Sequence, residues 1–268
     1  MKRQPAVAGQ FYPGRSDALR HMLLDLLPSP RQGQSAIGIV SPHAGYIYSG
    51  AIAGKVFSRV RIPSRVLILG PNHHGGGHKA ALFATGAWLS PLGEAGIDEE
   101  LATAILDGCP GVVTDEDAHR HEHSLEVQLP FIQIMAPEAK IVPLCLGHLP
   151  LEELLTMGEA LGRILAPFGD EILIVASSDM THYESGEAAR EKDMAALEPV
   201  LELDPEGLYR TVLGRGISMC GVMPVVAMLT AAKALGAAKA ELVEYGNSGD
   251  VTGDQSSVVG YAGVILTR

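Results

Sequence analysis

Cysteine is scarce in this chain of 268 residues, which contains only Cys109, Cys145 and Cys220. Three cysteines so far apart cannot build a disulfide framework. Long apolar runs are missing too, and none approaches the roughly 18–20 residues that a membrane-spanning helix requires. The first residues are not followed by the apolar stretch of a signal peptide. We therefore expect a cytoplasmic protein without a membrane segment.

Basic residues are also few. Lys and Arg number 20 against 31 Asp and Glu, which gives a net charge of −11, and the basic residues are scattered. Such a chain is a poor candidate for binding nucleic acid or an anionic membrane by electrostatics. No linker, repeat or low-complexity segment divides the sequence, which predicts a single domain over residues 1–268.

Short apolar runs alternate with amphipathic segments from end to end. This alternation predicts an α/β fold of three layers, in which helices cover both faces of a central mixed, mostly parallel sheet. The expected strands are 37–40, 66–69, 141–146, 172–176, 241–245 and 257–266. The expected helices are 16–27, 49–60, 98–106, 122–135, 151–165, 186–200, 205–213 and 221–235.

Metal-binding side chains follow three of the expected strands. His43 follows the first strand, His73 and His74 follow the second, and Asp179 and His182 follow the strand at 172–176. In an open α/β sheet, ligands bind where the carboxyl ends of the strands enter their loops. A neutral imidazole suits iron, copper, zinc or nickel. Each histidine alone could equally be a loop residue bonded to a carbonyl, but together they predict a shared pocket.

Asp179 and His182 are three residues apart, so they can serve one site if the segment turns into a helix. Asp179 could orient a ligand imidazole, and His182 could act as an acid–base group or contact the substrate. The alternative for Asp179 is the N-cap of a helix, and the two roles are compatible. Cys220 directly precedes an apolar helix, where a thiol is expected to have a lowered pKa and to become a nucleophile or metal ligand.

The most polar part of the chain is the segment 115–126. If it is helical, His119 and His123 share one face, as do Glu122 and Glu126, and either pair could hold a metal. The favoured interpretation is a helix start from which His123 or Glu126 faces the pocket, while the other charges are solvated.

Together these segments resemble the Memo family, also called AmmeMemoRadiSam system protein B. The resemblance runs in order over nearly the whole chain. It is carried by Ser41-Pro42-His43-Ala44-Gly45-Tyr46, Ile68-Leu69-Gly70-Pro71-Asn72-His73-His74, Glu122-His123-Ser124-Leu125-Glu126-Val127-Gln128-Leu129-Pro130, Ser177-Ser178-Asp179-Met180-Thr181-His182, Met219-Cys220-Gly221 and the segment 254–262.

That resemblance implies a fold similar to the LigB-type class III extradiol dioxygenases, whose active site holds ferrous iron. It implies His43, His73 and Cys220 as metal ligands and Asp179 and His182 as the other pocket residues. The third ligand would be a thiolate where extradiol enzymes have a carboxylate, so copper is as plausible as iron. Weaker pocket candidates are His74, His123, Glu126 and Tyr46.

Three functions remain open. The favoured one is a metal-dependent redox protein or dioxygenase-like enzyme that acts on a small molecule or peptide. The second is a scaffold or regulatory binding module that uses the same pocket. A serine hydrolase is the third, but the nucleophile elbow Gly-x-Ser-x-Gly is absent. The resemblance also implies a radical-SAM protein and an AMMECR-type protein as partners, and we see no nucleotide or flavin site.

Overall fold

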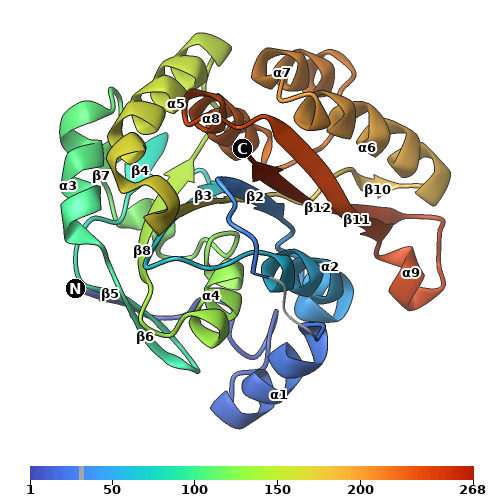
Figure 1. Cartoon of the computed structure of the whole chain (residues 1–268). Coiled ribbons are helices and arrows are strands. Elements are labelled where there is room, and N and C mark those ends of the chain that lie inside the picture. The colour runs from blue at the N-terminus through green and yellow to red at the C-terminus, as the bar shows by residue number, and fades with distance from the viewer. Residues whose placement is uncertain (30–32) are drawn as a thin grey trace.

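A mixed nine-stranded sheet forms the centre of the computed structural model, which describes residues 1–29 and 33–268. The strand order is β10-β12-β2-β9-β3-β8-β4-β7, and β11 pairs with β12 (Figure 1). The strands are β2 (Gly38–Ser41), β3 (Arg65–Pro71), β4 (Ala80–Leu82), β7 (Val113–Thr114), β8 (Lys140–Leu146), β9 (Ile172–Ser177), β10 (His182–Glu184), β11 (Lys239–Asn247) and β12 (Val258–Thr267). A second sheet contains β1 (Lys2–Arg3), β5 (Ala87–Ser90) and β6 (Gly93–Gly96).

Four parallel strands occupy the middle of the large sheet, in the order β2-β9-β3-β8. Antiparallel pairs flank them, with β12 on the β2 side and β4 on the β8 side. Every residue of β9 is buried, because helices cover both faces of the sheet there. The predicted α/β fold with a mixed central sheet is confirmed.

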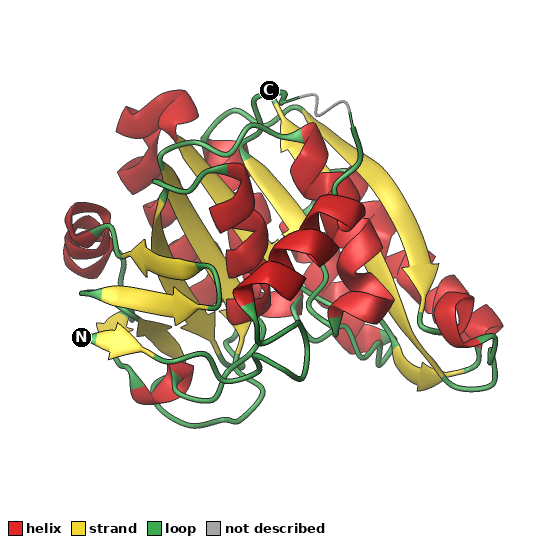
Figure 2. Ribbon diagram, turned by 90° about the horizontal axis from the view of Figure 1, so that it is seen from below, coloured by secondary structure: helices red, strands yellow, loops and turns green. Residues whose placement is uncertain are grey.

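Two layers of helices enclose this sheet. In Figure 1, α5, α6, α7 and α8 lie above it and α1, α2 and α4 lie below it, and Figure 2 shows the lower layer crossing the strands. The helices are α1 (Ser16–Leu26), α2 (Tyr46–Arg59), α3 (Glu99–Gly108), α4 (Leu129–Met135), α5 (Leu151–Leu165), α6 (Gly186–Leu201), α7 (Pro205–Gly214), α8 (Val222–Ala234) and α9 (Gly249–Thr252). Among the described residues, no helix is long and apolar enough to span a membrane.

Helix α8 is apolar on all sides, since it packs between the strands β2, β9 and β3 and the helices α5 and α7. Its position matters for the site, because its N-terminus lies at the sheet edge where the parallel strands end. Gly221 caps the helix there, and Cys220 directly precedes it.

The structure corrects one predicted helix and decides one that the sequence left open. The helix expected at 122–135 begins only at Leu129, with Pro130 in its first turn, and a short 3-10 helix, Glu126–Gln128, precedes it. The residues before it are irregular because the Glu122 carboxylate accepts the backbone N–H groups of His123 and Ser124. The segment from Asp179 to His182 does not become a helix but leads into β10. Six short strands were not predicted, namely β1, β4, β5, β6, β7 and β10.

Candidate metal centre

The parallel strands bring the predicted histidines to one edge of the sheet. His43 follows β2 and His73 follows β3, two strands that both pair with β9. His123 joins them from the irregular segment before α4. Potential ligand atoms of these three histidines all lie within 4.8 Å of one another. Three imidazoles at this separation form a group that can hold a metal ion.

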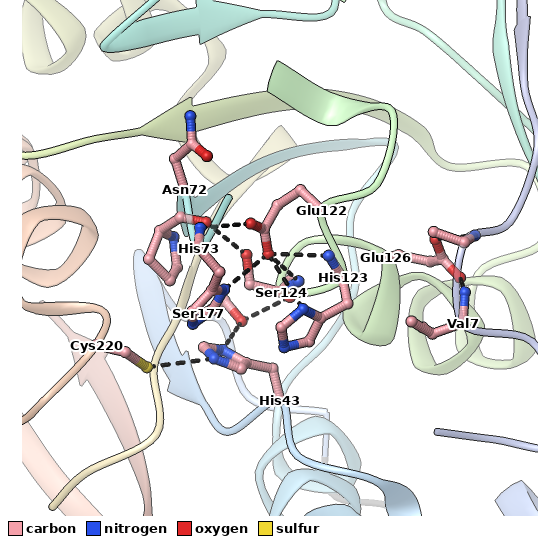
Figure 3. A network of polar contacts seen from close by, with 12 residues as sticks. Val7, His43, Asn72, His73, Glu122, His123, Ser124, Glu126, Ser177 and Cys220 are labelled. Atoms are coloured by element: carbon pink, nitrogen blue, oxygen red, sulfur yellow. Dashed lines mark hydrogen bonds and ion pairs between the residues drawn. The ribbon is translucent and has the colours of Figure 1, made fainter. Parts of the chain in front are cut away.

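The three rings face one another closely (Figure 3). The ring centroids of His73 and His123 are 4.6 Å apart, and those of His43 are 5.2 Å from His73 and 5.5 Å from His123. His43 is 1% exposed, whereas the other two are partly exposed. The cluster is therefore sealed on the side of the sheet and open on the side of His73 and His123.

Hydrogen bonds fix the tautomer of His43. The Ser177 hydroxyl donates its only hydrogen to the Ser124 carbonyl at 2.7 Å, and it accepts from the Gln128 amide nitrogen at 2.8 Å. That amide nitrogen also donates to the Pro42 carbonyl, which fixes its orientation. The Ser177 oxygen therefore acts as an acceptor toward His43 Nδ1, 2.8 Å away. His43 carries its proton on Nδ1, so Nε2 has the lone pair, and its neighbour there is Cys220 Sγ at 3.3 Å.

A buried carboxylate does the same for His73. Glu122 Oε1 accepts from His73 Nδ1 at 2.9 Å, and Oε2 accepts from the His73 backbone N–H at 2.7 Å. The lone pair of His73 Nε2 is consequently free for a ligand. A carboxylate behind a ligand histidine is a common partner in metal sites, because it fixes the ring and raises its basicity.

The electrostatics keep the imidazoles of His43 and His123 neutral and the Glu122 carboxylate charged. Burial lowers the pKa of His43 well below its usual value, and His73 and His123 lower it further. Burial also lowers the pKa of His123 to about 4. Burial on its own would raise the pKa of Glu122, but the hydrogen bonds from the His73 ring and from the Ser124 backbone N–H hold it well below its usual range. Metal ligation requires neutral imidazole, so no proton has to leave His43 or His123 at neutral pH.

Cys220 lies beside the histidines but outside the three-histidine group. Its Sγ is 3.3 Å from His43 Nε2 and 3.3 Å from the Asp179 backbone nitrogen, which donates to it. The lowered pKa expected for this thiol is wrong for the metal-free protein, because burial and the charge of Asp179 raise it well above its usual value. Cys220 thus contacts His43 at the edge of the cluster as a protonated thiol.

Two glycines allow these segments to approach the strand ends. A Cβ atom on Gly221 would lie 2.3 Å from the Ser177 carbonyl oxygen, so only glycine lets the Cys220 segment dock on the end of β9. A Cβ atom on Gly70 would lie 2.7 Å from the Ser124 hydroxyl, at the place where the His123 segment covers β3.

The predicted pocket residues Asp179 and His182 contact the site in different ways. The Asp179 carboxylate accepts the backbone N–H of His43 at 2.8 Å, so it holds the loop rather than a ligand ring. Burial raises the pKa of Asp179 to about 7. His182 lies on β10, where its Nδ1 is 3.0 Å from the Ser218 carbonyl oxygen. Their side chains are not bonded to each other.

The weaker candidates are separated by the fold. His74 is exposed and forms a second possible metal group with Glu122 and His123. Tyr46 is buried and donates to the Val127 carbonyl at 2.7 Å. The Glu126 carboxylate points away from the histidines and binds the N-terminal segment (Figure 3).

Two residues of the site, Ser177 and Gln128, were not predicted, and Glu122 was considered only as one of a helical pair with Glu126. Glu122 stands directly before His123 in the sequence, so an acidic neighbour was a visible signal, but nothing in the pattern distinguished it from Glu126. The interpretation of His119 and His123 as a helical metal pair is wrong. His119 is fully buried elsewhere, with Nε2 2.9 Å from the Ala81 carbonyl oxygen.

Comparison with known proteins agrees with the motifs. The family model described as Memo-like protein matches residues 3–265. A MEMO1 family protein of Methanopyrus kandleri is 42% identical over 100% of both chains, and one of Aquifex aeolicus is 45% identical over 98% of both. A crystal structure of an uncharacterized Escherichia coli K12 protein shares the fold, with 16% identity, 86% of this chain and 99% of that chain covered, and a TM-score of 0.53. The chain belongs to the Memo family.

Proposed function

We propose that this Memo family protein is a metal-dependent redox protein that binds iron or copper and acts on a small substrate with dioxygenase-like chemistry. The observation that carries the proposal is the group of three imidazoles, His43, His73 and His123, whose potential ligand atoms lie within 4.8 Å of one another. Such a cluster at the carboxyl edge of a parallel sheet is where α/β proteins bind their ligands.

The residues present fit a transition metal. Ser177 and Glu122 hold the protons of His43 and His73 on Nδ1, so both Nε2 lone pairs are available. No Lys or Arg pairs with the Glu122 carboxylate in the described part of the chain, so a cation at the histidines would offset its buried charge. Imidazole ligands suit iron and copper, and the nearby Cys220 sulfur adds a soft donor that favours copper.

His43 and His73 are therefore the proposed ligands, and either His123 or Cys220 supplies the third. A bound iron or copper ion would supply Lewis-acid and one-electron chemistry at the site. Asp179 holds the His43 loop through its backbone N–H. His182 donates its Nδ1 proton to the Ser218 carbonyl, which leaves Nε2 able to take a proton from a substrate. The likeness to the LigB dioxygenases and the two partner proteins remain predictions from the family resemblance.

Metal content tests the proposal. The protein is purified anaerobically without an affinity tag, and its metals are measured by plasma mass spectrometry. His43→Ala, His73→Ala, His123→Ala and Cys220→Ala are measured beside it, with circular dichroism as the check of folding. We expect near-stoichiometric iron or copper in the wild type and its loss in the first two variants.

The other two variants decide the third ligand. If His123→Ala loses its metal and Cys220→Ala keeps it, the three-histidine site is supported. If Cys220→Ala loses its metal and His123→Ala keeps it, the ligands are His43, His73 and the Cys220 thiolate. If the wild type contains no metal and takes up neither iron nor copper when offered, the redox function is overturned and a binding module becomes the better hypothesis.

A further inference from the structure

A small pocket lies directly beside Cys220, on the side away from the sheet interior. It has a volume of about 210 Å³ and is enclosed by the ends of β3 and β8, the end of α7 and the segment that leads into α8. Cys220 forms part of its wall, and the Sγ atom of that residue is 3.3 Å from His43 Nε2. The pocket and the histidine cluster are thus separated by a single side chain.

The wall of this pocket is mostly apolar. Leu146, Val212, Ile217, Met219 and Met223 are among the lining residues, and no Asp, Glu, Lys or Arg of the described chain lines it. A charged ligand group would lose its hydration there without gaining a partner. Two methionines in one wall give it an adaptable shape, since the thioether chain is flexible and polarisable.

The polar side chains of the pocket are not free to bind a ligand in its interior. The Asn72 amide donates to the Gly76 carbonyl at 2.7 Å and accepts the Gly75 N–H at 2.8 Å, within its own turn. His148 is exposed, which places it at the mouth. The pocket therefore has an apolar interior, as subsites for hydrocarbon groups do.

A larger cavity of about 700 Å³ does not compete for this role. Its lining includes Lys79, Glu152 and Glu153, and it contains none of the residues of the metal centre. Size alone would favour it, but the small pocket is lined by Cys220, whose Sγ atom is 3.3 Å from His43 Nε2.

We propose that this pocket is the subsite for an apolar group of the substrate, either one aromatic ring or one branched aliphatic chain. The proposal rests on the proposed function, because it places the reacting end of the substrate at the histidine cluster and the hydrocarbon end beyond Cys220. The volume sets the size of the group, since an apolar cavity of about 150 Å³ is enough to bind benzene. A fused or charged ring system does not fit this description.

Toluene is the first probe, and the methionine methyl groups report where it binds. In protein labelled with 13C at the methionine methyls, toluene should shift the Met219 and Met223 signals saturably and leave that of Met135 unchanged. Benzoate, which carries a charge, should not shift them. If toluene moves no methionine signal, or moves all of them alike, the subsite does not exist.

A variant whose side chain fills the pocket, compared with a matched control elsewhere on the surface, tests whether toluene binds in this pocket. Leu213 lines the pocket and is 45% exposed, whereas Leu24 on α1 is 48% exposed and does not line it. Leu213→Trp should weaken toluene binding at least tenfold, and Leu24→Trp should leave it unchanged. Equal binding by the two variants would overturn the proposal.

Hydroxamic acids test the link to the metal centre, since their head group chelates iron and copper. Phenyl, benzyl and phenethyl hydroxamates are compared with acetohydroxamate on metal-loaded protein. At least one aromatic member should bind tenfold or more tightly than acetohydroxamate, and this advantage should disappear in Leu213→Trp. If the advantage survives in that variant, the ring lies elsewhere and the proposal is wrong.

Metal content, measured on the same samples, separates the two proposals. If the protein contains stoichiometric metal but toluene does not shift its methionine methyl signals, the subsite proposal is overturned and the proposed metal centre stands. A metal-free protein that still binds toluene at Met219 and Met223 would overturn the redox function and, with it, the assignment of the pocket to a substrate of that reaction.

Discussion

Glu122 and Glu126 are four residues apart and both fully buried, yet they stabilise different parts of the molecule. The Glu126 carboxylate accepts from Arg3, from the Ala6 and Val7 backbone N–H groups and from the Tyr12 hydroxyl. It is paired with a permanent cation and fastens the N-terminal segment to the core.

Among residues 1–29 and 33–268, no Lys or Arg side chain pairs with the Glu122 carboxylate. Its hydrogen bonds come from the His73 ring and from the backbone N–H groups of His73, His123 and Ser124. Hydrogen bonds from N–H groups keep this carboxylate ionised. Glu126, with its permanent countercharge, thus stabilises the fold, whereas Glu122 is bonded to a proposed ligand histidine, and under the proposed function a bound cation would offset its charge.

The largest expected effect is on stability, from Glu126→Ala. The change leaves the Arg3 guanidinium buried without its partner, since Arg3 is 6% exposed. We expect a loss of about 3–5 kcal/mol in the free energy of unfolding, measured by urea denaturation. The double variant Arg3→Met, Glu126→Leu should recover much of this loss. A cost below about 1 kcal/mol for the single change would show that the pair is not the N-terminal anchor.

Buried His119 is expected to make a smaller contribution to the free energy of unfolding, and this contribution depends on pH. Burial lowers its folded-state pKa from 6.5 to about 4, so between these values the unfolded chain binds more protons than the native protein. The stabilisation is complete above pH 6.5 and is lost as the pH falls toward 4, by about 3 kcal/mol in total. His119→Gln can keep the bond to the Ala81 carbonyl and should flatten this part of the urea-derived stability profile. An unchanged profile would contradict the assignment.

Glu122→Gln tests the role of the carboxylate that binds the His73 ring. The amide cannot accept all the N–H groups that the carboxylate accepts, so His73 loses its fixed tautomer. We expect a decrease in metal affinity of about 10–100-fold, measured by competition with a chelator of known affinity. Glu126→Gln is the matched control and should leave the affinity of the folded protein unchanged. Equal losses in both variants would show that the two carboxylates are not functionally distinct.

Ser177→Ala is expected to have the smallest effect. It removes the acceptor for His43 Nδ1 but leaves the imidazole buried in place. The metal affinity should fall about tenfold. Nitrogen NMR of the metal-free protein should show the Nδ1–H tautomer of His43 in the wild type and a mixture in the variant. A single unchanged tautomer would mean that Ser177 does not set it.

Much of the fold and part of the site could be predicted from the sequence. The buried runs that became β3, β8 and β9, and the helix α5, follow directly from periodicity and chain breaks. His43 and His73 were found because parallel strands must deliver their following residues to a common edge. Short strands such as β4 escaped prediction, because three residues carry too little pattern.

The alternation of strands and helices, the family motifs and the sheet edge that holds the histidines can all be read from the order of the residues. Which side chains meet at that edge depends on the three-dimensional fold. It brought His123 to the cluster, turned Glu122 toward the histidines and Glu126 away from them, and showed Asp179 bound to a backbone N–H. The directions of these side chains could not be predicted because they lie in irregular segments. There, hydrogen bonds fix the conformation, and many of them join residues far apart in the chain, so local periodicity gives no signal.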